Sequence, residues 1–242
     1  MKLAHMYEYD DTPSILIAGT SWLDNEHSLA LFNMWLRTIK HLNPDESFVL
    51  VDACSPFDPR LHVPKETNVF RWEENVGAIT RGGKDGCGRS MCKAVELAIE
   101  GNYDYLCISE SDAIFCQPVR PIINRMYKAG VKAASIGLAS PYLFAEWSTV
   151  FIDVKYLRDT KFIERYDWEH SQPWPLVEMR LEKMFGDDLF FLNYRGFRNE
   201  SNQMNVANLA NNYPYSNCQW LTHCADLNLY ARMLELNQVY PC

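Results

Sequence analysis

Short apolar runs alternate with helical patterns through the first half of the chain. Four runs fit buried strands, at residues 15–18, 47–51, 68–72 and 103–109. Two amphipathic segments lie among them: one follows Asp24 or Asn25 as a cap and stops at Asn43-Pro44, and the other follows Ser90 and stops at Gly101. Strands that alternate with helices in this way predict an α/β fold, with a mostly parallel sheet flanked by helices.

The second half is less regular. The pattern predicts a helix ending at Gly130, strands at 132–137 and 148–154, a helix around 177–184, a further helical run that starts at Gly186-Asp187-Asp188, and a last helix around 227–234. The chain shows no internal repeat. The length of 242 residues fits one large domain or two small ones.

Composition and charge exclude several classes of protein. The 242 residues are 48% hydrophobic and 22% charged, an ordinary globular mixture, and the net charge of −8 argues against nucleic-acid binding. We find neither a secretion signal nor an apolar window long enough for a transmembrane segment, so we expect a cytoplasmic protein.

The eight cysteines include no C-x-x-C pair, and most are expected to be small buried side chains rather than parts of a disulfide framework. A zinc site built from Cys218, His223 and Cys224 with a distant partner is a weaker alternative.

Polar groups collect where the predicted parallel strands end, which is the edge at which ligands bind in open α/β sheets. They include Gly19 and Thr20 after the first strand, Asp52 after the second, and Glu110-Ser111-Asp112 after the fourth. The glycine-dense segment 75–89 directly precedes the second predicted helix, and we expect it to lie at the same edge.

That glycine-dense segment offers backbone amide groups together with Arg81, Lys84 and Arg89, which suits a diphosphate. It has neither P-loop spacing nor the glycine spacing of a dinucleotide-binding loop. A surface loop with solvated charges explains the same residues.

Glu110 and Asp112 are two residues apart, so both carboxylates project to one side of an extended chain. Paired carboxylates suit Mg²⁺ or Mn²⁺ bound together with substrate phosphates. A turn followed by a helix cap is the alternative for this pattern.

The order of these pieces resembles the nucleotide-binding half of GT-A fold glycosyltransferases, which use nucleotide-sugar donors. Asp52, Asn75-Val76-Gly77, the helix from Ser90 and the strand leading into Glu110-Ser111-Asp112 occupy the positions of the family's motifs, the last as a DXD-like motif. The resemblance covers residues 14–117.

The resemblance implies a single GT-A-like, Rossmann-like domain, with donor binding in 14–117 and acceptor binding in 118–242. It further implies a UDP-sugar or GDP-sugar donor, a glycan or other hydroxyl acceptor, and a divalent cation. The implied donor-site residues are Gly19, Thr20, Asp52, Asn75, Gly77, Arg81, Lys84, Arg89, Glu110 and Ser111, with Asp52 near the base or ribose.

The implied metal ligands are Glu110 and Asp112, with His223 as a third ligand or as a structural histidine. Glu110 departs from the family pattern, which has Asp in its place, and this puts the metal requirement in question.

Asp187 and Asp188 resemble the acidic motif that begins a helix and supplies the general base in inverting members, with Asp188 preferred. An ordinary helix cap explains the pair as well, and Asp153 and Glu178 are weaker candidates for the base. Three tryptophans suit either a sugar ring or the core: Trp147, Trp168 and Trp174.

The resemblance thus implies a metal-assisted, inverting glycosyltransferase. A sugar-phosphate nucleotidyltransferase is the first alternative, although residues 19–25 lack the basic residue that it expects. A non-catalytic carbohydrate-binding module of the same fold is the second, and the Glu110 departure is its best support.

Overall fold

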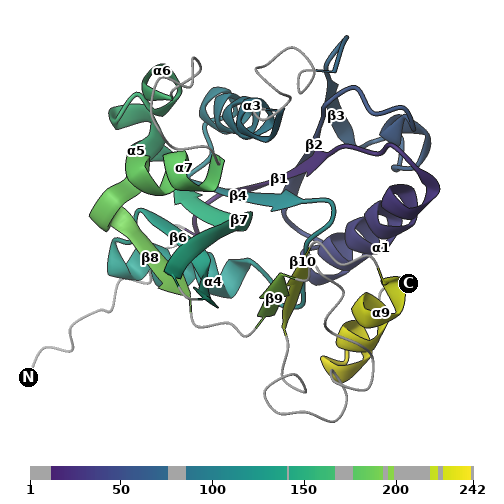
Figure 1. Ribbon diagram of the computed structural model, residues 1–242. Coiled ribbons are helices and arrows are strands. Elements are labelled where there is room, and N and C mark those ends of the chain that lie inside the picture. The colour runs from purple at the N-terminus through teal and green to yellow at the C-terminus, as the bar shows by residue number, and fades with distance from the viewer. Residues whose placement is uncertain are drawn as a thin grey trace, which may run out of the picture.

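Seven strands form the central sheet of the protein, seen here in a computed structural model (Figure 1). The structure describes residues 12–75, 86–140, 142–166, 177–192, 196–198, 219–222 and 226–240. In spatial order the strands are β3 (Asn68–Arg71), β2 (Ser47–Asp52), β1 (Ile15–Ser21), β4 (Tyr105–Glu110), β7 (Tyr142–Asp153), β6 (Ala133–Ser140) and β8 (Leu189–Leu192). A smaller sheet joins β5 (Ile114–Phe115), β10 (Trp220–Thr222) and β9 (Gly196–Arg198).

Most neighbouring strands of the large sheet are parallel. β1 pairs in parallel with β2 and β4, β2 with β3, and β6 with β8, whereas β7 runs antiparallel to both β4 and β6. The predicted fold class, a mostly parallel sheet flanked by helices, is therefore confirmed. Strands β1, β2, β3 and β4 all end at the same edge.

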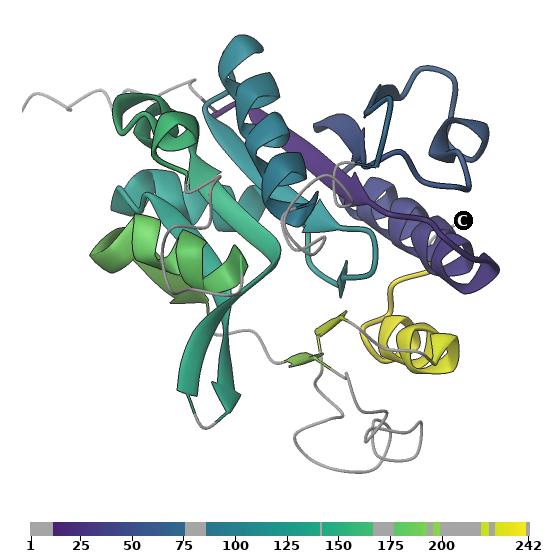
Figure 2. The same ribbon diagram turned by 45° about the horizontal axis from the view of Figure 1, so that its top comes forward.

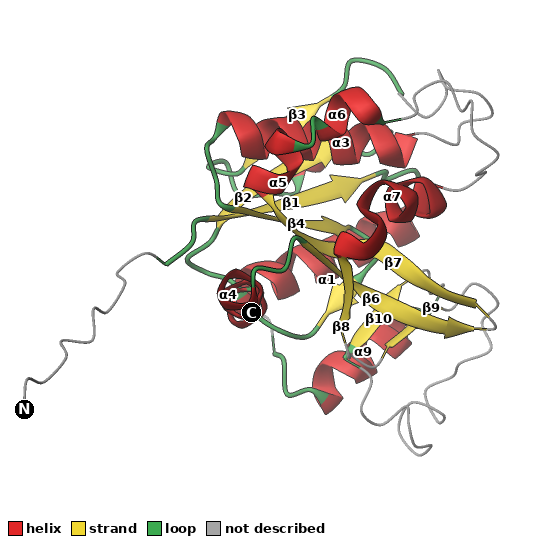
Figure 3. Cartoon of the chain, turned by 90° about the vertical axis from the view of Figure 1, so that its left-hand side faces the viewer, coloured by secondary structure: helices red, strands yellow, loops and turns green. Residues whose placement is uncertain are grey.

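Helices cover both faces of the sheet (Figures 1 and 3). On one face lie α3 (Gly86–Glu100), α5 (Val154–Asp159), α6 (Phe162–Arg165) and α7 (Val177–Phe185). On the other lie α1 (Glu26–Leu42) and α4 (Arg120–Ala129), with α9 (Leu227–Leu236) packed beside α1. Within the described residues, no helix is long and apolar enough to cross a membrane.

The first helix starts where the sequence predicts, and the second does not. The Asn25 side chain accepts a hydrogen bond from the Ser28 amide, and the Ser28 hydroxyl accepts one from the Asn25 amide. Asn25 therefore caps α1. Helix α3 begins at Gly86 rather than after Ser90, and Ser90 is buried within it. Packing on the sheet outweighs the low helix propensity of the glycines, because Gly88 too is buried in this first turn.

The predicted helical run from Gly186 is wrong. Gly186–Asp188 form a single 3-10 turn, and the aromatic residues after it make the edge strand β8. Gly186 has φ +54°, which ends the helical conformation, and pairing with β6 then fixes the next four residues as a strand. Strands β6 and β7 are both longer than predicted.

The Trp35 side chain packs so closely against β1 that position 19 has no room for a side chain. A Cβ atom at Gly19 would lie 2.3 Å from the Trp35 Cη2 atom, and the Trp35 side chain is buried. The Trp35 indole N–H donates to the Ser109 hydroxyl at 2.9 Å, which fixes the ring beneath β1 and β4. This packing accounts for the glycine without a ligand.

We expect Gly19→Ala to lower the free energy of unfolding by about 2 kcal/mol, because the new methyl group overpacks a rigid indole. Urea unfolding measures the change. In a Trp35→Leu background, where the ring is absent, the same substitution should cost much less. An equal cost in both backgrounds would show that Trp35 is not the obstacle.

Candidate functional site

The carboxyl ends of β1, β2 and β4 bring six of the predicted site residues together: Gly19, Thr20, Asp52, Glu110, Ser111 and Asp112. Ser21 pairs with Asp52, and Thr20 pairs with Glu110. The Ser111 amide then donates to the Thr20 carbonyl at 2.9 Å, which continues the pairing beyond β4. The predicted meeting of these strand ends at one sheet edge is thus confirmed in the described chain (Figure 2).

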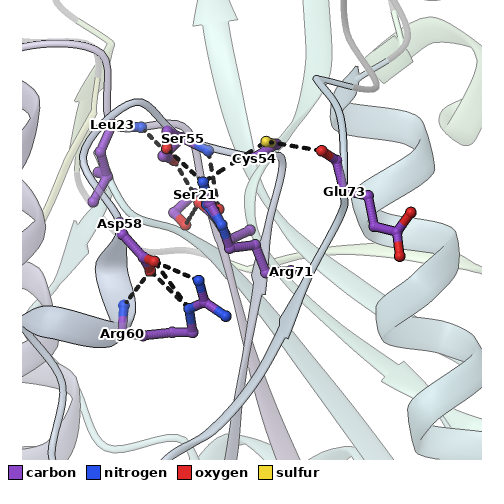
Figure 4. Close-up of polar contacts among 9 residues, drawn as sticks. Ser21, Leu23, Cys54, Ser55, Asp58, Arg60, Arg71 and Glu73 are labelled. Atoms are coloured by element: carbon purple, nitrogen blue, oxygen red, sulfur yellow. Dashed lines mark hydrogen bonds and ion pairs between the residues drawn. The ribbon is translucent and has the colours of Figure 1, made fainter.

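The Asp52 side chain has polar partners from three segments of this edge, and Figure 4 labels these partners, Ser21, Ser55 and Arg71. Its carboxylate is fully buried and accepts from the Ser21 hydroxyl at 3.0 Å, the Ser55 amide at 3.0 Å and the Ser55 hydroxyl. Arg71, at the end of β3, completes the set with an ion pair of 2.9 Å. A buried carboxylate requires such partners, because its desolvation is costly otherwise.

The same cluster shapes the segment that follows β2. Arg71 also donates to the Ser55 carbonyl at 2.9 Å, and the Ser55 hydroxyl accepts from the Leu23 amide at 2.7 Å. Cys54, which lies between Asp52 and Ser55 in the sequence, adopts φ +63°, a left-handed conformation that few non-glycine residues take. The Asp52 carboxylate therefore faces the protein interior and holds two loops of the edge in place.

The turn after β4 carries the second pair of acids. The Ala113 amide donates to the Glu110 carbonyl at 3.0 Å, and the Tyr230 hydroxyl donates to the Asp112 carbonyl at 2.8 Å. Both acids are half-buried, while Ser111 between them is buried. The Cys87 thiol, in the first turn of α3, donates to Glu110 Oε1 at 3.1 Å.

The small sheet brings the C-terminal part of the chain to this turn. β5 follows Asp112-Ala113 directly and pairs antiparallel with β10, with Leu221 opposite Ile114. Strand β10 ends at Thr222, and His223 comes next in the sequence, outside the described residues.

Two carboxylates fit a Mg²⁺ or Mn²⁺ ion that takes its remaining ligands from phosphate oxygens and water. Among the described residues, no group of three or more His, Cys, Asp and Glu side chains could hold a metal by itself. Glu110 and Asp112 would therefore hold such a cation only together with other ligands, such as those phosphate oxygens.

Several predicted residues lie outside the described part of the chain: Gly77, Arg81, Lys84, Trp168, Trp174, Cys218, His223 and Cys224. Asn75 is half-buried just after β3, and Arg89 lies in the first turn of α3. Trp147 is a core residue, stacked on Phe185 with ring centroids 5.5 Å apart.

Asp187 and Asp188 do not share the edge. Leu189, which follows them, lies level with Leu106 at the start of β4, three strands away. Strand spacings then put Asp188 about 20 Å from Glu110. Burial raises the pKa of the Tyr156 phenol, and a hydrogen bond with the Asp188 side chain raises it further.

Of the two weaker candidates for the base, Asp153 lies away from Glu110 and Asp112. Asp153 caps α5 through the Tyr156 amide and pairs with Lys132 at 2.9 Å, next to the start of β4. Glu178 lies in α7.

Sequence reasoning missed Arg71, Ser55 and Cys87. Arg71 ends β3, and Asp52 ends the neighbouring strand β2. Opposite charges at the ends of two neighbouring predicted strands could have indicated this ion pair. Cys87 carried no such signal, because the sequence placed it in a loop before the helix.

No model of a protein family matches the chain, and no curated protein matches it in sequence. Solved structures of glycosyltransferases do match its fold. The bifunctional glycosyltransferase WbbM has a TM-score of 0.59 at 10% identity, over 97% of this chain but only 51% of WbbM. The galactosyltransferase LgtC, in complex with donor and acceptor sugar analogues, has a TM-score of 0.52 at 15% identity, over 94% of this chain and 96% of LgtC.

A glycosyltransferase that acts in glycosylation of the major capsid of PBCV-1 has a TM-score of 0.50 at 11% identity, over 94% of this chain and all of that one. The chain thus spans about half of WbbM and nearly the whole of the other two. Its fold is the GT-A type of these glycosyltransferases, as the sequence predicted.

We expect Asp52→Asn to cost about 3 kcal/mol of unfolding free energy, since it leaves Arg71 without its buried partner charge. Chemical denaturation measures this loss. Asp58→Asn is the matched control, because Asp58 pairs with the exposed Arg60 in the same loop and should cost clearly less. Equal costs for the two variants would contradict the structural role assigned to Asp52.

The Arg60 hydrogen bond lowers the pKa of Asp58 to about 2 from an ordinary 3.8. The ionised form is thus favoured on folding, so its contribution is fully present above about pH 4 and is lost as the pH falls towards 2. Unfolding of wild type and Asp58→Asn should differ at pH 5 and converge near pH 2. A difference that persists at pH 2 would contradict this assignment.

Proposed function

We propose that this protein transfers a sugar from a nucleoside-diphosphate sugar, UDP- or GDP-linked, to an acceptor hydroxyl with the help of a divalent cation. The observation that carries the proposal is the position of Glu110 and Asp112 in the turn after β4, beside the ends of β1 and β2. Ligands bind at this edge of open α/β sheets.

In this proposal the Glu110 and Asp112 carboxylates hold Mn²⁺ or Mg²⁺ together with the donor diphosphate. Such a cation offsets the negative charge of the departing diphosphate. His223 is proposed as a third ligand, because it follows Thr222 at the end of β10, the strand that pairs with β5 just beyond Asp112.

The remaining donor contacts belong to the chain around the edge. Arg89, together with Arg81 and Lys84, is proposed to bind the diphosphate, and Gly19, Thr20, Asn75, Gly77 and Ser111 to line the donor site. Asp52 acts indirectly in this proposal, since its buried carboxylate fixes Ser21 and the loop that follows β2. The base and ribose then meet that loop rather than the carboxylate.

Residues 118–242 are proposed to bind the acceptor, a glycan or another hydroxyl compound. The argument for inversion depended on Asp187 and Asp188, and their position at the opposite edge removes its support. We therefore propose sugar transfer without assigning its stereochemistry.

The two other candidate functions make different demands. A nucleotidyltransferase needs cationic groups in its first loop, and residues 19–25 contain none. A non-catalytic module would bind the nucleotide sugar and leave it intact.

Calorimetric titration of UDP and GDP, with and without Mn²⁺, tests the proposal. One nucleotide should bind at least tenfold more tightly with Mn²⁺, and Asp112→Asn should abolish this gain because it removes a ligand charge. Equal affinity with and without the metal would contradict metal-assisted binding. Slow hydrolysis of the matching nucleotide sugar would exclude the non-catalytic module.

We expect Asp188→Asn to keep both Mn²⁺-dependent nucleotide binding and sugar transfer, because Asp188 lies at the far edge of the sheet. A nucleotide-release assay over a panel of donors and acceptors measures transfer. If Asp188→Asn bound the donor normally yet failed to transfer, Asp188 would return as the candidate base.

A further inference from the structure

The Cys87 thiol, in the first turn of α3, contacts the Glu110 carboxylate at the end of β4. The sulfur lies 3.1 Å from Glu110 Oε1, within hydrogen-bonding distance for an S–H donor, and both side chains are half-buried. A carboxylate oxygen has two lone pairs, so an oxygen that accepts a hydrogen bond from a thiol can also bind a cation. The contact thus orients the carboxylate and is compatible with cation binding.

Glu110 needs such a contact more than an aspartate would. Its backbone is fixed by pairing with β1 and by the hydrogen bond from the Ala113 amide. Its side chain has one more rotatable bond than the aspartate that the GT-A pattern expects at this position. Each such bond adds conformational freedom that binding a cation must remove.

The thiol itself is held in place by packing. Helix α3 begins at Gly86, so Cys87 belongs to the first turn of a helix rather than to a loop. Met91, Cys92 and Val95 bury the following turns against the sheet. The position of the sulfur relative to β4 is therefore set by the core.

We propose that Cys87 is a positioning residue, whose thiol holds the Glu110 carboxylate in the orientation that binds the divalent cation. This inference rests on the proposed function and explains how the site accommodates glutamate in place of aspartate. Hydrogen-bond partners of metal ligands typically change metal affinity by about 10- to 100-fold.

The test is a titration of the whole protein with Mn²⁺ in the presence of UDP or GDP, whichever binds, with free Mn²⁺ followed by electron paramagnetic resonance. Cys87→Ala should weaken Mn²⁺ binding about tenfold. Cys87→Ser keeps an O–H donor and should restore binding to within about threefold of wild type. Cys92→Ala is the matched control: it removes a buried thiol from the same helix and should leave Mn²⁺ affinity unchanged even if it lowers the melting temperature.

A double-mutant cycle separates positioning from a general effect on the helix. Glu110→Asp is shorter by one methylene and draws the carboxylate away from the sulfur. Adding Cys87→Ala to Glu110→Asp should therefore change Mn²⁺ affinity less than twofold. The same tenfold loss in both backgrounds, or no loss in either, would overturn the role of Cys87.

The two failures are distinguishable. If wild type binds no Mn²⁺ with either nucleotide, the proposed function fails and the inference fails with it. If wild type binds Mn²⁺ and Cys87→Ala binds it equally well, only the positioning role is overturned.

Discussion

The buried charge of Asp52 is the constraint on which the candidate site depends. A carboxylate with no solvent exposure is tolerated only with full hydrogen bonding and a counter-ion, and its partners here come from three different segments. Ser21 ends β1, Ser55 follows β2, and Arg71 ends β3. Satisfying one charge therefore aligns three strand ends and fixes the backbone between them.

Helix packing supplies the second half of the site. Trp35 of α1 fits against Gly19 and bonds to Ser109 in β4, so the strand that delivers Glu110 is held from one face. Helix α3 presses on the other face and brings Cys87 to that carboxylate. The acids of the turn are thus held between two packed layers, an arrangement that favours a preorganised site.

The sequence predicted the regular parts of this molecule well. Buried strands and one-sided helices have distinct periodicities, so β1, β2, β4 and α1 were placed within a few residues, and the edge that collects Thr20, Asp52 and Glu110 followed from the parallel topology. The prediction failed where tertiary contacts override local preference. Gly86–Ser90 read as a loop because glycine disfavours helices, and Leu189–Leu192 read as a helix because four apolar residues carry no decisive periodicity.

The wrong prediction of a helix at Leu189–Leu192 also put two candidate catalytic residues in the wrong position. Asp187 and Asp188 were assigned to the site on the expectation of a helix start, but strand pairing sends them to the other edge. Side-chain roles were similarly beyond the pattern: nothing in the local sequence distinguishes a solvent-facing Asp52 from one that is fully buried against Arg71.

Hydrogen exchange measured by mass spectrometry, with and without UDP or GDP and Mn²⁺, tests most directly whether the ligand binds at the carboxyl edge. Added nucleotide and metal should slow exchange in peptides covering residues 19–25, 52–57 and 108–115, and should leave residues 186–192 unchanged. Slower exchange confined to 186–192, with none at those three strand ends, would contradict the account.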